Sequence, residues 1–125
     1  MPNTNAHGPE RIILYARAAT RYEAESKPSI SRQLETLREH AGEEDYEVLE
    51  EVKDPGQSGA SLDRPGIRRI RRLVLGEEEG AGVSAVLATV KDRFSRRVVD
   101  RLVLERRLGG CGCELRTLRE GTPSA

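Results

Sequence analysis

The chain has few aromatic and few sulfur-containing residues. Its 125 residues include one phenylalanine, three tyrosines, two cysteines and no tryptophan. The hydrophobic 36% of the chain is therefore mainly Leu, Val, Ile and Ala, which predicts an aliphatic core. A chain of this length is long enough for one modest core and hence for one domain.

Long apolar runs are also absent. No run approaches the roughly 20 residues that a helix needs to cross a bilayer. Residues 1–9 are polar and turn-rich, unlike a secretory signal, in which a charged segment precedes an apolar one. We therefore expect a soluble, cytoplasmic protein without a membrane partner, in which residues 1–10 form a flexible tail.

The two cysteines, Cys111 and Cys113, are separated by a single glycine. This spacing is too tight for an ordinary structural disulfide, and one pair supplies too few ligands for zinc. The two histidines, His7 and His40, are remote in sequence and have no ligand spacing that links them to the cysteines. We expect no metal and no cofactor, and interpret the cysteines as two inert thiols beside a strand.

The formal net charge is zero, but the charges are unevenly distributed. Residues 1–61 hold 7 basic and 12 acidic side chains, whereas residues 62–107 hold 12 basic and 7 acidic. A neutral domain is a poor DNA binder by itself, because nonspecific affinity comes from neutralising phosphates. A basic second half is still able to form one face toward a polyanion. The charge pattern permits DNA contact without requiring it.

The hydrophobic pattern predicts an alternation of strands and helices. Strands are expected at 11–16, 46–52, 83–90 and 113–118, and helices at about 30–41, 65–74 and 95–108. Such alternation is typical of an α/β fold, with a mainly parallel sheet of four or five strands flanked by helices in three layers. The acidic strand at 46–52 is expected near an edge.

Details of the helices also follow from the pattern. Ser29 and Asp63 are expected to cap the first and second helices. Val98, Leu102 and Leu108 are expected to face the core from the third helix.

Polar clusters follow three of the predicted strands. In parallel sheets, ligands and catalytic groups gather at the carboxyl ends of strands, so the loops after residues 16, 53 and 90 should lie close together. They carry Arg17, Asp54, Ser58, Asp92, Arg93 and Arg96, and Gln33 lies near the start of the first helix. Arg93 and Arg96, three residues apart, are expected to share a helical face.

Three arginines at one sheet edge predict a phosphate site. Guanidinium is a planar fork that matches two phosphate oxygens, and it stays charged at any relevant pH. It also stabilises the extra charge of a phosphoryl-transfer transition state. The sequence lacks the Gly-rich loops that bind nucleotide phosphates, which disfavours a module for a small phosphorylated ligand.

The chain resembles the serine recombinases, which include resolvases, invertases and larger integrases. The segment Tyr15 to Thr20 is similar to their Tyr-x-Arg-x-Ser-Thr signature. Further similar segments follow in the family's order: 29–33, ending in a glutamine, the Asp-x-Gly-x-Ser-Gly loop at 54–59, 62–66, 91–96, and 118–121. We expect residues 11–121 to form the family's catalytic domain and residues 122–125 to be a truncated end.

The resemblance implies a mechanism. The family's serine attacks a DNA phosphate, forms a phosphoseryl link and releases a 3′-hydroxyl, without a metal or nucleotide cofactor. Carried over, Arg17, Arg93 and Arg96 hold the phosphate, and Asp92 orients an arginine or assists proton transfer. Gln33 and Ser58 add hydrogen bonds. The secondary site residues are Asp54, Tyr15 and Glu120.

The chain departs from the family at the nucleophile, because Ala19 stands at the serine position. Glu23 occupies a place where many members have glutamine, and the neighbouring hydroxyl of Thr20 is expected to point elsewhere. The long dimerisation helix and the DNA-binding domain of the family are not in this sequence.

Two functions are therefore expected. The first is a site-specific recombinase catalytic domain, which is expected to be inactive in DNA integration or resolution because of Ala19. Its partner is expected to be DNA, bound weakly by this domain alone. In a full-length context we expect it to form a homo-oligomer. The alternative is a catalytically silent interaction module that pairs with an active recombinase.

Overall fold

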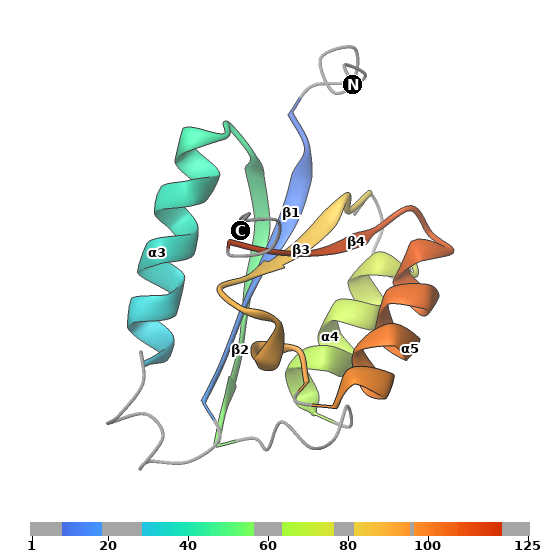
Figure 1. The fold of residues 1–125 in the computed structure, drawn as a ribbon. Helices are drawn as coiled ribbons and strands as arrows, with labels where there is room; N and C mark the ends of the chain where they lie inside the picture. The colour runs from blue at the N-terminus through green and yellow to red at the C-terminus, as the bar shows by residue number, and fades with distance from the viewer. Residues whose placement is uncertain (1–8, 19–28, 57–63, 77–81, 96, 119–125) are drawn as a thin grey trace, which may run out of the picture.

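The computed structural model describes residues 9–18, 29–56, 64–76, 82–95 and 97–118, and these form three layers (Figure 1). A four-stranded parallel sheet has the order β2-β1-β3-β4. Helix α3 covers one face, and helices α4 and α5 cover the other. The elements are β1 (Arg11–Ala18), α3 (Ile30–Glu43), β2 (Glu47–Pro55), α4 (Pro65–Val74), β3 (Ala85–Ala88), the 3₁₀ helix η1 (Lys91–Arg93), α5 (Val98–Gly109) and β4 (Glu114–Thr117). The predicted α/β fold is confirmed.

The central strand β1 divides the core in two, because successive side chains of a strand point to opposite faces. Ile13 and Tyr15 belong to the cluster under α4 and α5, whereas Ile12 and Leu14 belong to the cluster under α3. The core is mainly aliphatic, and it also contains Tyr15 and Phe94, whose rings stack with centroids 5.8 Å apart. Strand β2 lies at the edge of the sheet, as its acidic composition predicts.

Strand β2 extends further than the sequence predicts. Its pairing with β1 runs from Arg11 opposite Glu47 to Ala18 opposite Pro55. Both strands therefore continue past the expected ends, and Arg17 and Asp54 lie opposite each other within strands rather than in loops. The strand β3 is shorter than expected.

The first two helices begin differently. Helix α3 has the predicted cap, because Ser29 Oγ accepts a hydrogen bond of 3.2 Å from the Arg32 amide. Helix α4 has Arg64 at its N-cap, with no side-chain cap bond, so the expected cap at Asp63 is wrong. The carboxylate of Asp54 in β2 caps the start of α4 instead, because its Oδ1 accepts a hydrogen bond from the Gly66 amide at 2.7 Å.

The expected core face of α5 is wrong in part. Val98 and Leu102 are each 57% exposed, whereas Leu104 and Leu108 are buried. The helix begins at Val98 rather than near residue 95, and its inward positions are the pair at i and i+4, Leu104 and Leu108. Val98, Val99, Leu102 and Val103 form an outward face, which we call the α5 apolar face.

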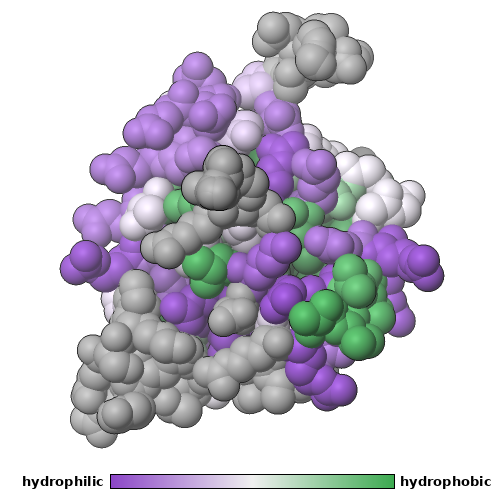
Figure 2. All heavy atoms as spheres, in the orientation of Figure 1, coloured by the Kyte–Doolittle hydropathy of each residue, from purple (hydrophilic) through white to green (hydrophobic). Residues whose placement is uncertain are grey.

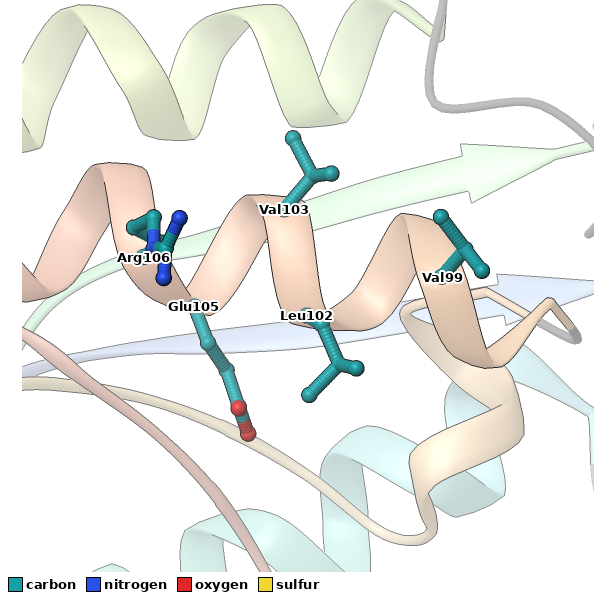
Figure 3. Close-up of a pocket in the computed structure, with 5 residues that line it drawn as sticks. All are labelled: Val99, Leu102, Val103, Glu105 and Arg106. Carbon is teal, nitrogen blue, oxygen red and sulfur yellow. The ribbon is translucent and has the colours of Figure 1, made fainter.

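The α5 apolar face is visible as a hydrophobic patch at the lower right of the molecule (Figure 2). Val99, Leu102 and Val103 line a surface hollow there together with Glu105 and Arg106 (Figure 3). Across the part of the chain that the structure describes, no helix has the length and apolar character to cross a membrane.

Candidate functional site

The carboxyl end of β1 and the end of η1 bring two predicted site residues together. Arg17 Nε donates to the Arg93 carbonyl at 3.1 Å, and Arg93 Nη1 donates to the Arg17 carbonyl at 3.2 Å. Arg17 is completely buried and Arg93 almost so. Each arginine therefore holds the backbone of the other, across 76 residues of sequence.

Gln33 of α3 forms hydrogen bonds with the end of β1. Its carboxamide accepts from the Arg17 amide at 3.2 Å and donates to the Arg17 carbonyl at 3.0 Å. In a β-sheet, a neighbouring strand would form these two hydrogen bonds with the backbone of Arg17, whereas here the Gln33 side chain forms them. Gln33 thereby fixes the backbone that carries the Arg17 side chain.

Asp54 joins three elements at the opposite side of β1. Its Oδ2 accepts from the Tyr15 hydroxyl at 2.7 Å, and its Oδ1 accepts from the Gly66 amide. Tyr15, which the sequence suggested only as a secondary member, is thus hydrogen-bonded into the site. Burial raises the pKa of the Tyr15 phenol well above its ordinary value, so the hydroxyl stays protonated and donates.

Arg64 is a site residue that the sequence reasoning did not single out. It is buried at the start of α4, and its Nη1 donates to the Tyr15 hydroxyl at 3.0 Å and to the Arg93 carbonyl at 3.2 Å. Its Nη2 donates to the Phe94 carbonyl. Two features of the sequence indicate Arg64: it directly precedes Pro65, the first residue of a predicted helix, and it lies in a segment similar to a family motif.

Arg17, Arg64 and Arg93 together form what we call the arginine cluster. Burying a guanidinium is costly unless its charge is met by hydrogen bonds or an anion. Three such groups at the carboxyl edge of a parallel sheet concentrate positive charge where ligands bind in this type of fold. The arrangement suits an anion with several oxygens, such as a phosphate group.

The remaining predicted site residues lie partly or wholly outside the described parts of the chain. Asp92 lies in η1, and its backbone alone is described. Arg93 ends η1 and α5 begins at Val98, and the helical face that Arg93 and Arg96 are expected to share stays a prediction, because Arg96 lies outside the described residues. The residues that lie outside the described parts of the chain are Ala19, Ser58, Arg96 and Glu120.

Other reactive groups do not join the site. Cys111 is exposed and Cys113 is buried, both as free thiols, and burial raises the pKa of Cys113 to about 12. Within the described residues, no three His, Cys, Asp or Glu side chains lie together in a way that holds a metal ion.

The fold and the site together define a three-layer α/β domain with a buried arginine cluster at the ends of its central strands. Residues 12–125 match the family model described as "Resolvase, N terminal domain". The chain belongs to this family, and its structure is that of a serine recombinase catalytic domain. Membership implies DNA binding and oligomerisation in general terms.

Solved structures agree with the family. The N-terminal catalytic domain of TP901-1 integrase is 29% identical, with a TM-score of 0.80 over 93% of this chain and 85% of that chain. A resolvase family site-specific recombinase from Streptococcus pneumoniae is 28% identical, with a TM-score of 0.72 over 90% and 74%. A serine recombinase from Sulfolobus solfataricus is 28% identical, with a TM-score of 0.65 over 87% and 68%. No curated protein sequence gives a significant match.

Proposed function

We propose that this domain holds a DNA phosphate at the arginine cluster and that, as written, it does not cleave DNA. The observation that carries the proposal is the reciprocal contact of Arg17 with Arg93 at the strand ends. Arg96 is the further phosphate ligand expected from the sequence. Residues 11–121 form the catalytic domain, with residues 1–10 and 122–125 outside it. The cytoplasm is the expected location of a protein with this substrate.

The proposed reaction requires a serine at position 19, which directly follows the end of β1 at Ala18. The serine oxygen forms a bond to phosphorus while the bond from phosphorus to the 3′ oxygen of the DNA breaks. The serine loses its proton and the 3′ oxygen gains one, so that the number of phosphate esters is conserved and the strands are able to rejoin. Alanine has no atom that performs this attack.

The remaining residues have supporting roles in the proposal. Arginines stabilise the charge that develops on the phosphate oxygens during the attack. Gln33 acts through the backbone of Arg17, and Asp54 acts through the start of α4, because their side chains form hydrogen bonds there. Asp92 orients an arginine or assists proton transfer, Ser58 adds a hydrogen bond, and Glu120 is a secondary member of the proposed site. No metal or nucleotide takes part.

The test is the Ala19→Ser variant, joined to a DNA-binding domain of known target sequence. We expect a phosphoseryl DNA adduct, detected as a covalent protein–DNA species by denaturing gel and mass spectrometry. The matched control is Ala18→Ser, which places the same hydroxyl one residue earlier and should give no adduct. Arg93→Ala in the Ala19→Ser background should reduce the adduct by about 100-fold or more, the scale of losing one preorganised charge partner. If the Ala19→Ser protein is folded and bound to its target DNA but forms no phosphoseryl adduct, the proposal is contradicted.

A second candidate function, silent pairing with a recombinase domain, is favoured by the α5 apolar face. Val98, Val99 and Leu102 are each more than half exposed. We propose a second copy of this chain as the occupant. Glu105 and Arg106 border the same hollow, so a two-fold arrangement is able to place opposite charges across the contact.

We expect Leu102→Lys to shift the chain from dimer toward monomer in sedimentation equilibrium, because the lysine charge loses solvation when the apolar face is covered. The matched control is Leu75→Lys, an exposed leucine after α4, which should leave the association unchanged. If wild type is monomeric at high concentration, or both variants behave alike, the α5 apolar face is not the contact.

A further inference from the structure

A cavity opens beside the site, on the α3 side of the sheet. It has a volume of about 280 Å³ and is lined by Arg32, Gln33, Thr36, Thr89, Val90, Arg93 and Leu118. Arg32 and Thr36 lie on the same face of α3, since they are four residues apart. The first turn of α3 and η1 both lie toward the end of the sheet at which β1 and β2 finish (Figure 1). We call this cavity the α3 pocket.

The polar lining of the α3 pocket consists of groups that donate hydrogen bonds. Two guanidinium groups, two hydroxyls and one carboxamide line it, and no Asp or Glu is among the described residues that do so. The chain has as many acidic as basic side chains, so a lining without carboxylates differs from the composition of the chain as a whole. Such a lining favours an anion with several acceptor oxygens.

The α3 pocket is continuous with the site. Gln33 and Arg93 are buried members of both, whereas Arg32 and Thr36 are exposed at the rim. Gln33 and Arg93 each bond to the carbonyl of Arg17, so the floor of the pocket is built from the contacts that hold the arginine cluster. An anion in the pocket would therefore lie next to a phosphate at the cluster.

We infer that the α3 pocket binds a second phosphodiester group of the same DNA strand, adjacent to the phosphate at the arginine cluster. This rests on the proposed function, which supplies the DNA. Arg32 and the hydroxyls of Thr36 and Thr89 contact the phosphate oxygens, and Val90 and Leu118 contact the sugar. The cavity lies below the roughly 300 Å³ at which small-molecule sites begin, which suits a phosphate and part of a sugar better than a whole free nucleotide.

The test measures affinity of the full chain for a short duplex DNA at several salt concentrations, by NMR titration of backbone amides. Arg32→Ala should weaken binding about five- to tenfold at 0.1 M salt and lower the slope of log affinity against log salt by about 0.9, as expected for one lost phosphate contact. Thr36→Val and Thr89→Val should each weaken binding about threefold, the scale of a neutral hydrogen bond, with the slope unchanged. The matched control is Arg38→Ala, which removes an exposed arginine from the same helix whose partner is Glu51.

The outcomes separate the possible sources of the phosphate. Saturable shifts at Thr36 and Thr89 with DNA, but not with millimolar inorganic phosphate or thymidine monophosphate, support the inference. Saturation of the pocket by either small molecule without competition from DNA would overturn the DNA strand as ligand. Equal affinity and salt slope in Arg32→Ala and wild type would overturn the pocket.

A failure of the inference is distinguishable from a failure of the proposed function. If Ala19→Ser forms the covalent adduct while Arg32→Ala binds DNA like wild type, the α3 pocket alone is overturned. If Ala19→Ser forms no adduct, the proposed function is overturned, whatever Arg32→Ala does. Melting temperatures of all variants show that each compared protein is folded.

Discussion

At the scale of single residues, Asp54 connects strand β2 to β1 and to the start of α4. Its two carboxylate oxygens satisfy a hydroxyl from β1 and an amide from α4. The Tyr15 hydroxyl in turn accepts from Arg64, which also bonds to the carbonyl of Arg93. Asp54 is therefore a positioning residue: it is linked to the arginine cluster through Tyr15 and Arg64.

We expect Asp54→Ala to lower the free energy of unfolding by about 3 kcal/mol, because it leaves two buried donors without an acceptor. Tyr15→Phe should lower it by about 1 kcal/mol, since one hydrogen-bonded hydroxyl is lost. Urea denaturation measures both, and the double variant should cost less than the sum, because the residues are in direct contact. An exposed control on α3, Glu39→Ala, should change stability by less than about 0.5 kcal/mol. Additive effects of the two changes would contradict the coupling.

Residue contacts of this kind were only partly predictable. The proximity of Arg17 and Arg93 follows from the rule that the loops after parallel strands meet at one edge of the sheet. Arg64 and Gly66 did not follow, because their roles depend on how closely α4 approaches β2. That approach is set by packing and not by the local sequence.

At the scale of elements, the start of α4 is held by close contact with β2. A Cβ added to Gly66 would lie 2.7 Å from Asp54 Cγ, well inside van der Waals contact. The short Asp54 side chain is fixed by bonds to Tyr15 and to Gly66 itself, so it has little room to move. Glycine is thus required at this position for its size.

We expect Gly66→Ala to lower the free energy of unfolding by about 2 kcal/mol, the cost of overpacking a buried contact. The matched control is Gly42→Ala in α3, where no atom lies within 4 Å of the added Cβ. That change should raise stability by about 0.5–1 kcal/mol, because alanine is the better helix former. Thermal and urea unfolding measure the two, and a shift of the same sign in both variants would contradict the steric argument.

The elements themselves were largely predictable, because each carries a clear apolar period. The errors fall where tertiary contacts decide. The acidic strand β2 was expected at an edge, and the structure shows what its charges do: Glu50 pairs with Arg69 of α4, and Glu51 pairs with Arg38 of α3. Hydrogen bonds from these arginines lower the pKa of both glutamates. The outward face of α5 was missed, because an apolar stripe has the same period whether a core or a partner covers it.

At the scale of the whole molecule, the sheet separates two clusters of buried side chains, one on each of its faces. Ile12 belongs to the cluster under α3, and Ile70 belongs to the cluster under α4 and α5. The site lies where both cores end: Gln33 reaches the Arg17 backbone from one face, and Arg64 reaches the Arg93 carbonyl from the other. Both layers are thus needed to hold the arginine cluster.

This arrangement predicts cooperative unfolding with independent core contributions. We expect Ile12→Val and Ile70→Val each to lower the free energy of unfolding by about 1 kcal/mol, since each removes one buried methylene. In the double variant the costs should add to within about 0.5 kcal/mol, because Ile12 and Ile70 belong to separate clusters of the described residues, on opposite faces of the sheet. The exposed control Val99→Ala should cost less than either. Urea unfolding, followed by circular dichroism and by tyrosine fluorescence, measures these free energies and the cooperativity of unfolding. Coincident curves with additive costs support a single domain with two cores. Separate transitions would show that the two layers unfold independently.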